Sequence, residues 1–458
     1  MDDINSTLEK IVKLDKDASK LDRDLLKHNS NFSEMHYNMG LAKPNPVSAK
    51  LLKKDVTLLS KKVKLLQRKL KKDDTNFAYQ ELFLRNAQYF LTARLAFNDF
   101  FYNPNSRIRP RTLLSILFEH PYKTVLDTQN NPDRFYRLDH TRLRLSQKFS
   151  ANLFSPNERE TIKIAEELVP SIKNFLISLS RDYGLLQKTE KFDFEMVLEK
   201  EDGFSSWENG TLSLDINSLV FCRDNGKLDL YLVKALRDSS HELLGHAIHQ
   251  KNSEMLSESL KPCDKNEYGF VQKVLSEGIG NYWENKVINH IRRSQKKIKI
   301  EVPEHVSQKL KTKNNDKTRY LQIDPDNLME LYLATKLHIF WNAQDIIEHT
   351  NRMEEPLSRE RIKTYAETHN FCLVRDVFYK NSRYSQRIFD EAPVVFGAPY
   401  YRKVVSKAVR EYGIPLKLAE KVTSIGSWST KTHYHFVELL LESMGYEKKV
   451  QDRTQKSI

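Results

Sequence analysis

Cysteine, glycine and long apolar runs are scarce in this sequence. Their scarcity argues against several classes of protein. The 458 residues include 13 glycines and only three cysteines, Cys222, Cys263 and Cys372. The cysteines lie far apart and in no CxxC pair, which excludes a disulfide framework and a cysteine zinc site and favours buried thiols. The sequence also contains no glycine-rich phosphate loop, internal repeat or low-complexity tract.

Targeting and membrane-spanning segments are lacking as well. No run approaches the roughly 18 apolar residues of a membrane span. The first residues, MDDINSTLEK, lack the basic-then-apolar order of a secretory signal. These two absences predict a cytoplasmic protein without a transmembrane segment.

The composition itself is typical of a large globular protein. Apolar residues make up 39% and charged residues 29% of the chain, with 23 Phe and 20 Tyr. This composition excludes a disordered chain, and the length allows two or three domains without requiring more than one.

The net charge of +13 is concentrated in two segments. Residues 51–72 hold nine Lys/Arg against one acid, and residues 292–319 hold ten against three. Such segments attract anionic lipid, nucleic acid or acidic polypeptide tails, and a solvated lysine-rich face is an equally good interpretation. Of these partners we favour a peptide or protein tail and expect no nucleic acid.

Residues 1–75 are predicted to form a basic helical hairpin, with the connection NMGLAKPNPVSAK between its helices. In the second helix, apolar residues alternate at spacings of four and three, the pattern of a narrow packing seam. These residues are Leu52, Val56, Leu59, Val63, Leu66 and Leu70. The seam predicts packing on the first helix or on the rest of the chain, with a coiled coil as the alternative. Its lysine-rich opposite face leaves a membrane-surface or acidic-partner role open.

Residues 76–458 are predicted to form a second, mainly α-helical domain with a small β-sheet. Long aromatic-rich periodic stretches indicate its helices. Residues 211–216 alternate apolar and polar side chains, which predicts a half-buried strand. After a turn at Asn225-Gly226, we expect a helix from about Leu228 to Gln250. A basic insertion is expected at about 291–320.

The predicted helix carries HELLGH, which offers His241, Glu242 and His246. A catalytic zinc ion needs three protein ligands, an open position for water and a carboxylate that accepts the water's proton. Residues at i and i+4 lie about 40° apart around an α-helix, whereas residues at i and i+5 lie about 140° apart. The two histidines can therefore share an ion only through a π-type bulge, which Gly245 favours at 243–245.

A third ligand is expected at Glu277, 36 residues after His241. Its segment, SEGIGNYWEN, is predicted to be helical, and the two glycines that follow Glu277 would let this helix approach the first closely. Facing helices are a sound source of metal ligands in an all-α site. The alternative is Glu284 as the ligand, with Glu277 as a hydrogen-bond acceptor for a ligand histidine. We expect His249 to be structural.

HELLGH followed by EGIG resembles the motifs of the HExxxH zinc carboxypeptidases, which include the microtubule-associated tyrosine carboxypeptidases and their bacterial QEGLA-motif relatives. The segment FCLVRDVFY at 371–379 is similar to that family's F-T-[KR]-D-x-V-Y stretch. The resemblance covers about residues 160–410 through short motifs. It departs where SEGIG replaces QEGLA and where Gly245 replaces the usual threonine.

Two other zinc peptidase families share part of the pattern. The sequence WEN at 283–285 is similar to the end of the ESQSRxWEN motif of M32-type carboxypeptidases, whose histidines have i+4 spacing. HELLGH is itself the zinc motif of dipeptidyl peptidase III, whose EECRAE segment has no counterpart here. All three families have two histidines, a base glutamate and a later helical glutamate.

The resemblance implies a gluzincin-like architecture, with 76–458 as a catalytic domain that has its small β-sheet beside the active site. It implies Zn²⁺ held by His241, His246 and Glu277, with Glu242 as the general base. We expect the strand at 211–216 to pair with an extended peptide substrate.

A carboxypeptidase also needs a cation for the terminal carboxylate of its substrate and a donor for the oxyanion. We expect Arg375 and Arg383 to be the candidates for the cation, and Tyr379 and Tyr384 for the donor. The resemblance implies acidic tubulin-like tails as substrate. The alternatives are an aminopeptidase or dipeptidyl peptidase, and a non-catalytic basic helical scaffold that binds acidic filaments.

Overall fold

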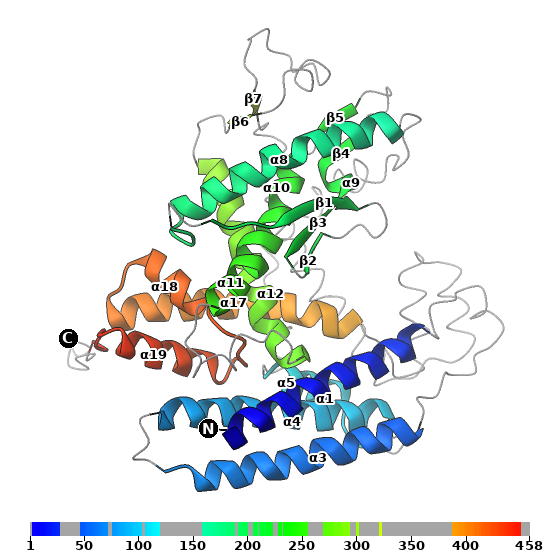
Figure 1. Cartoon of the computed structure of the whole chain (residues 1–458), viewed down its shortest axis with the longest axis vertical. Helices are drawn as coiled ribbons and strands as arrows, with labels where there is room; N and C mark the ends of the chain where they lie inside the picture. The colour runs from blue at the N-terminus through cyan, green and yellow to red at the C-terminus, as the bar shows by residue number, and fades with distance from the viewer. Residues whose placement is uncertain are drawn as a thin grey trace, which may run out of the picture. The chain divides into compact units, whose positions relative to one another are not determined.

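The structure is a computed structural model of the whole chain (Figure 1). It describes residues 2–27, 46–71, 76–102, 106–119, 158–187, 191–199, 205–208, 210–222, 228–230, 232–254, 269–293, 299–301, 320–322 and 387–449.

The chain divides into two compact units, which we describe separately. Unit 1 consists of Met1–Asn130, Asn252–Gly278 and Asn342–Ile458, and unit 2 consists of Asn131–Lys251 and Ile279–Trp341. The described elements are mostly helices, and the largest described sheet has three strands. The predicted fold class, mainly α with a small β-sheet, is confirmed.

The N-terminal part of unit 1 is helical. Its described helices are α1 (Asp2–Lys27), α3 (Pro46–Lys69), α4 (Phe77–Tyr102) and α5 (Pro110–Phe118). Helix α3 packs on both α1 and α4, and Figure 1 shows these three helices side by side. The predicted division of the chain near residue 75 stays a prediction.

The apolar seam of α3 accounts for this packing. Its residues Leu52, Val56 and Val63 are buried, which confirms packing of the seam within the same chain. The helix begins at Pro46, inside the predicted connection. Proline fits the first turn of a helix because the N–H that it lacks would have no partner there.

The C-terminal part of unit 1 is also helical, with α17 (Arg387–Tyr412), α18 (Leu416–Thr423) and α19 (His433–Ser443). Helix α17 packs on α18 and on α5, and α19 packs on α18 and on α4. Trp428 fixes this arrangement because its ring stacks between Phe83 and Phe436, at centroid distances of 5.7 and 4.5 Å. Helix α4 and the C-terminal helices thus share one core.

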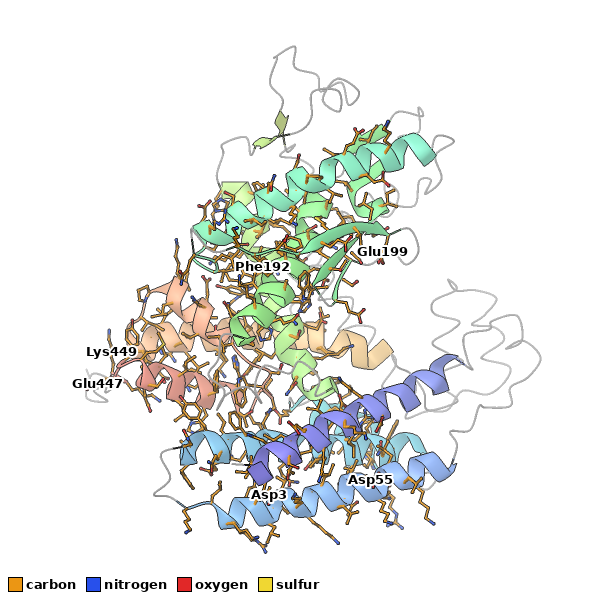
Figure 2. All side chains as sticks on the ribbon, viewed as in Figure 1. Asp3, Asp55, Phe192, Glu199, Glu447 and Lys449 are labelled. Atoms are coloured by element: carbon orange, nitrogen blue, oxygen red, sulfur yellow. The ribbon has the colours of Figure 1, made fainter. Side chains whose placement is uncertain are left out.

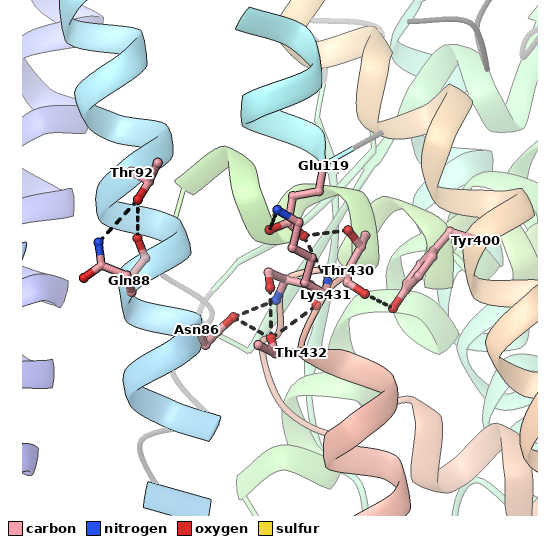
Figure 3. Close-up of polar contacts among 9 residues, drawn as sticks. Asn86, Gln88, Thr92, Glu119, Tyr400, Thr430, Lys431 and Thr432 are labelled. Carbon is pink, nitrogen blue, oxygen red and sulfur yellow. Dashed lines mark hydrogen bonds and ion pairs between the residues drawn. The ribbon is translucent and has the colours of Figure 1, made fainter. Parts of the chain in front are cut away.

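A partly buried polar network joins α4, α5 and the loop before α19 within unit 1 (Figure 3). The Oε2 atom of Glu119 accepts hydrogen bonds from Thr430 Oγ1 at 2.7 Å and from Lys431 N at 3.0 Å. Asn86 Oδ1 accepts a hydrogen bond from Thr432 Oγ1 at 2.9 Å. Glu119 ends α5 in the left-handed region, at a φ of 59°. The bond between Asn86 and Thr432 satisfies polar groups that are removed from water.

Unit 2 has helix α8 (Glu158–Asp182) packed on a sheet of β1 (Glu195–Glu199), β2 (Ser206–Glu208) and β3 (Thr211–Asp215). The strand order is β1-β3-β2. Strand β3 pairs in parallel with β1 and antiparallel with β2, with Leu212 opposite Met196 and Trp207.

The prediction of a strand near 211–216 is confirmed, but the prediction that it is half-buried is wrong. Residues Leu212 to Asp215 are all buried, because β3 is the central strand of its sheet. Ile216 does not continue the strand but begins the short helix α9 (Ile216–Leu219).

The chain then forms a hairpin of β4 (Val220–Cys222) and β5 (Leu228–Leu230). The predicted turn at Asn225-Gly226 lies outside the described residues. The predicted helix start near Leu228 is wrong, because Leu228 pairs with Cys222 in this hairpin. The helix begins at Leu232 instead.

The long helix that follows has three parts: α10 (Leu232–Ser240), the π-helix η1 (His241–Ala247) and α11 (Ile248–Glu254). Helix α12 (Gly269–Arg293) comes next. Strands β6 (Lys299–Glu301) and β7 (Tyr320–Gln322) pair antiparallel, so a segment near the beginning of the predicted basic insertion lies beside its end. No described helix is long and apolar enough to cross a membrane.

Candidate metal centre

The π-helix η1 brings His241 and His246 to one face. The N–H of Ile248 donates to the carbonyl oxygen of Leu243, five residues back, as the wider π turn requires. The two imidazole rings lie 5.0 Å apart between centroids and are inclined by 71°. The bulge predicted at 243–245 is confirmed, and it extends over seven residues.

Glu277 of α12 completes a group of three potential ligands. One atom from each of His241, His246 and Glu277 lies within 4.8 Å of the other two, and all three side chains are half-buried. Zinc binds imidazole nitrogen and carboxylate oxygen at about 2.0–2.2 Å, so small side-chain rotations bring these atoms around one ion. Two neutral nitrogens and one carboxylate oxygen therefore fit a divalent metal in both distance and donor type.

A glycine contact sets how closely α12 approaches η1. A Cβ atom on Gly245 would lie 2.4 Å from the Cα of Gly280, so the two backbones touch at this point. A Cβ atom on Gly280 would lie 2.5 Å from Nε2 of His241. Both positions need glycine, since any side chain would separate the helices or displace the histidine ring. Gly280 is one helical turn after Glu277, which places that carboxylate near the same histidine.

The other glycine of the segment has a different neighbour. A Cβ atom on Gly278 would lie 2.5 Å from the carbonyl oxygen of Gly397, on helix α17. The expectation that both glycines serve the approach to the histidine helix is therefore wrong for Gly278. This residue faces another side of α12, because two residues along a helix correspond to a rotation of about 200°.

Glu284 lies behind the metal group and contacts His241. Its Oε2 atom is 3.4 Å from Nδ1 of His241, and its Oε1 atom is 3.6 Å from Nε of Arg237. A carboxylate that accepts from Nδ1–H leaves Nε2 for a metal and fixes the orientation of the ring. Of the two arrangements left open by the sequence, the structure has Glu277 in the ligand group and Glu284 as the partner of the histidine.

Arg237, which contacts Glu284, belongs to a group of charged residues on α10. Arg237 also forms an ion pair with Asp238 at 2.7 Å, and Lys234 lies 3.9 Å from Asp238. Burial lowers the pKa of Lys234, although Asp238 opposes the shift. Lys234, Arg237 and His241 follow one another at spacings of three and four, so they lie on one side of the helix. This spacing in the sequence could have indicated that Lys234 and Arg237 lie near His241, but neither residue was predicted to belong to the site.

Two further residues of the helix were predicted to have different roles. Glu242 stands next to His241 on η1, half-buried and outside the group of three ligands. Its role as general base stays a prediction. His249 is 2% exposed and also lies outside the ligand group, as expected for a structural histidine.

The sheet lies beside the metal group through β2, which contacts η1. Nε1 of Trp207 donates to Oε1 of Gln250 at 2.9 Å and holds β2 to the end of this helix. The expectation that residues 211–216 pair with a substrate is wrong, because β3 already pairs on both sides. In the described sheet, β2 is the edge strand on this side.

The residues predicted to bind the substrate cannot be placed. Arg375, Tyr379, Arg383 and Tyr384 lie outside the described residues, as does the whole segment 371–379. Their roles stay predictions.

Comparisons with known proteins identify no family for this chain. The sequence matches no family model and no curated protein. Among solved structures it is similar to a carboxypeptidase of Pyrococcus furiosus, in a form described as apo-Mg. The two share 12% identity and a TM-score of 0.39, over 98% of this chain and 97% of that one. A likeness at this level assigns no role to any residue, so the functional conclusion depends on the geometry of the metal group.

Proposed function

We propose that this chain is a zinc-dependent metallopeptidase and that it acts as a carboxypeptidase. The observation that carries the proposal is the convergence of His241, His246 and Glu277 through a π-helix and a backbone contact at glycines. Two histidines and a glutamate are the ligands of several catalytic zinc sites, in which the fourth position stays open for water or substrate.

The chemistry divides between the metal and the protein. Zinc at this position would polarise the scissile carbonyl group and increase the acidity of the attacking water. Glu242 accepts the proton of that water and passes it to the leaving amine. Glu284 holds the His241 ring through Nδ1 and keeps the ligand geometry fixed.

The proposed substrate is the C-terminal end of an acidic polypeptide. The motif resemblance favours removal of C-terminal residues, with Arg375 or Arg383 as the partner of the substrate carboxylate and Tyr379 or Tyr384 as the oxyanion donor. Strand β2 is the described edge beside η1, so we place the extended substrate backbone there. The net charge of +13 would favour an acidic tail such as that of tubulin.

The test compares the wild type with Glu242→Gln. The wild type should contain about one zinc ion per chain by elemental analysis, since the site has one set of ligands. It should release single C-terminal residues from N-terminally blocked peptides, as read by mass spectrometry. Glu242→Gln should keep the metal and lose roughly a hundredfold to ten-thousandfold in kcat/KM, the usual contribution of a general base.

Glu195→Gln is the matched control, because Glu195 is an exposed residue of β1 and the chemical change is the same. It should keep wild-type activity. A chain that binds no zinc, or a Glu242→Gln variant as active as the control, would contradict the enzyme proposal. Release of N-terminal residues from C-terminally blocked peptides would show an aminopeptidase or dipeptidyl peptidase instead.

A further inference from the structure

Helix α3 carries a row of exposed leucines. Large apolar side chains are exposed at five described positions, and three of these are Leu51, Leu58 and Leu65, with exposed fractions of 55, 53 and 50%. Their spacing of seven residues is about two helical turns, so they follow one line along the helix and span about 21 Å. The seam of α3 that packs on α1 and α4 is a separate set of residues, and these leucines point away from it.

A second row, of cations, runs beside the leucines. Lys54, Lys61 and Arg68 each follow one of the leucines by three residues, which places them next to it on the helix surface. All three are exposed, and among the described residues none of them forms an ion pair, unlike Lys53 and Lys62 of the same helix. Asp55, labelled on α3 in Figure 2, is the only acidic residue between Leu51 and Lys71. The exposed face therefore combines separated apolar groups with a strong positive charge.

A second copy of the chain does not fit this face. Pairing two such helices would bring the two rows of cations together, and like charges at an interface cost free energy. An acidic polypeptide would satisfy the cations but would not need the leucines. Each leucine is also isolated from the next by about 10 Å along the axis. The surface of a helix is convex, so a flat surface can cover this face without a matching groove.

We propose that this face of α3 binds the surface of an anionic lipid bilayer. The three leucines would enter the boundary between headgroups and acyl chains, as apolar residues of interfacial helices do. The long stems of Lys54, Lys61 and Arg68 lie along the same boundary and keep their charges at the level of the lipid phosphates. The helix stays folded on α1 and α4 throughout, so the chain associates with the membrane without crossing it.

Vesicle co-sedimentation of the full chain tests the proposal. The wild type should bind vesicles of phosphatidylcholine with phosphatidylserine at least tenfold more tightly than vesicles of phosphatidylcholine alone. Replacing Leu51, Leu58 and Leu65 together by Ser should weaken binding at least tenfold. Replacing Lys54, Lys61 and Arg68 together by Gln should also weaken it at least tenfold, since each cation near an anionic surface contributes roughly fivefold.

The control is Leu416→Ser, because Leu416 is 49% exposed on α18, a different helix. It should bind as the wild type does, and thermal unfolding of every variant shows whether the fold is intact. Equal binding to both kinds of vesicle would overturn the proposal, as would binding that survives loss of the leucines. Binding to poly-glutamate but not to vesicles would also overturn it, and would identify the face as a site for acidic polypeptides.

Discussion

The orientation of His241 depends on two residues that do not belong to the ligand group. Glu284 contacts the ring at 3.4 Å, and Arg237 lies 3.6 Å from the same carboxylate. Because Arg237 neutralises part of the charge of Glu284, the carboxylate can be buried beside the histidine without a free negative charge. The sequence indicated Glu284 only as a rival ligand. Its actual position follows from helix packing, which spacing alone does not determine.

The carboxyl group of Glu119 predicts how the free energy of unfolding depends on pH. Burial raises the pKa of Glu119 above the ordinary value of 4.5. The folded chain therefore holds a proton over a pH range in which the unfolded chain has lost it. By linkage, the contribution of this group to the free energy of unfolding is largest below pH 4.5 and declines as the pH rises through the raised pKa.

Glu119→Gln removes this titration. We expect the unfolding free energy of the variant, relative to the wild type, to increase from about pH 4.5 towards neutral pH, where the buried carboxylate is charged in the wild type. Urea unfolding at several pH values measures the difference. Glu447→Gln, at an exposed position, controls for the chemical change. A difference between Glu119→Gln and wild type that does not vary with pH would contradict the prediction.

At the scale of elements, helix α12 has two close backbone contacts on different sides. Gly280 meets Gly245 and His241, whereas Gly278 meets Gly397. The pair allows a matched test of the metal group, because Gly278→Ala and Gly280→Ala make the same change two residues apart.

We expect both alanine variants to lose about 1–3 kcal/mol of stability, the usual cost of overpacking. Only Gly280→Ala should also weaken zinc binding, by at least tenfold, since its Cβ atom would lie 2.5 Å from Nε2 of His241. Chelator competition gives the zinc affinity, and urea unfolding gives the stability. Equal zinc affinity in the two variants would show that the His241 ring does not depend on Gly280.

The sequence predicted the type of an element better than its burial, its pairing or its first residue. The π-helix followed from a geometric requirement, since histidines five residues apart cannot share a metal on a regular α-helix. The burial of β3 did not follow, because it depends on β1 and β2 pairing with both of its edges. The start of the histidine helix was missed because residues 228–230 belong to a hairpin whose partner strand precedes them. Local pattern carries no information about such pairings.

At the scale of the whole molecule, the excess of positive charge predicts how the reaction with an acidic substrate depends on salt concentration. If the substrate is an acidic tail, kcat/KM for an acidic peptide should fall several-fold between about 0.05 and 0.5 M salt, because screening shortens the range of the attraction. A neutral peptide of the same length should show little change. Steady-state kinetics at several salt concentrations measures both. An equal response of the two peptides would argue against electrostatic selection of the tail.

Unit 1 is assembled from segments that lie far apart in the sequence. Such an assembly cannot be predicted from local patterns. The seam of α3 correctly indicated packing within the chain. No local pattern indicated that α4 and α19 pack together. Contacts between segments more than 300 residues apart, such as that of Asn86 with Thr432, depend on the complete fold. The candidate substrate residues at 375–384 stay predictions, because they lie outside the described residues.

The π-helix also has an evolutionary consequence. Inserting one residue into a regular HExxH helix, at a position where the chain bulges, yields HExxxH with the two histidines still on one face. The two motifs are then one mutational event apart, although sequence comparison treats them as different patterns. Two histidines with either spacing can therefore lie on one face of a helix, so the difference of one residue does not by itself separate two kinds of site.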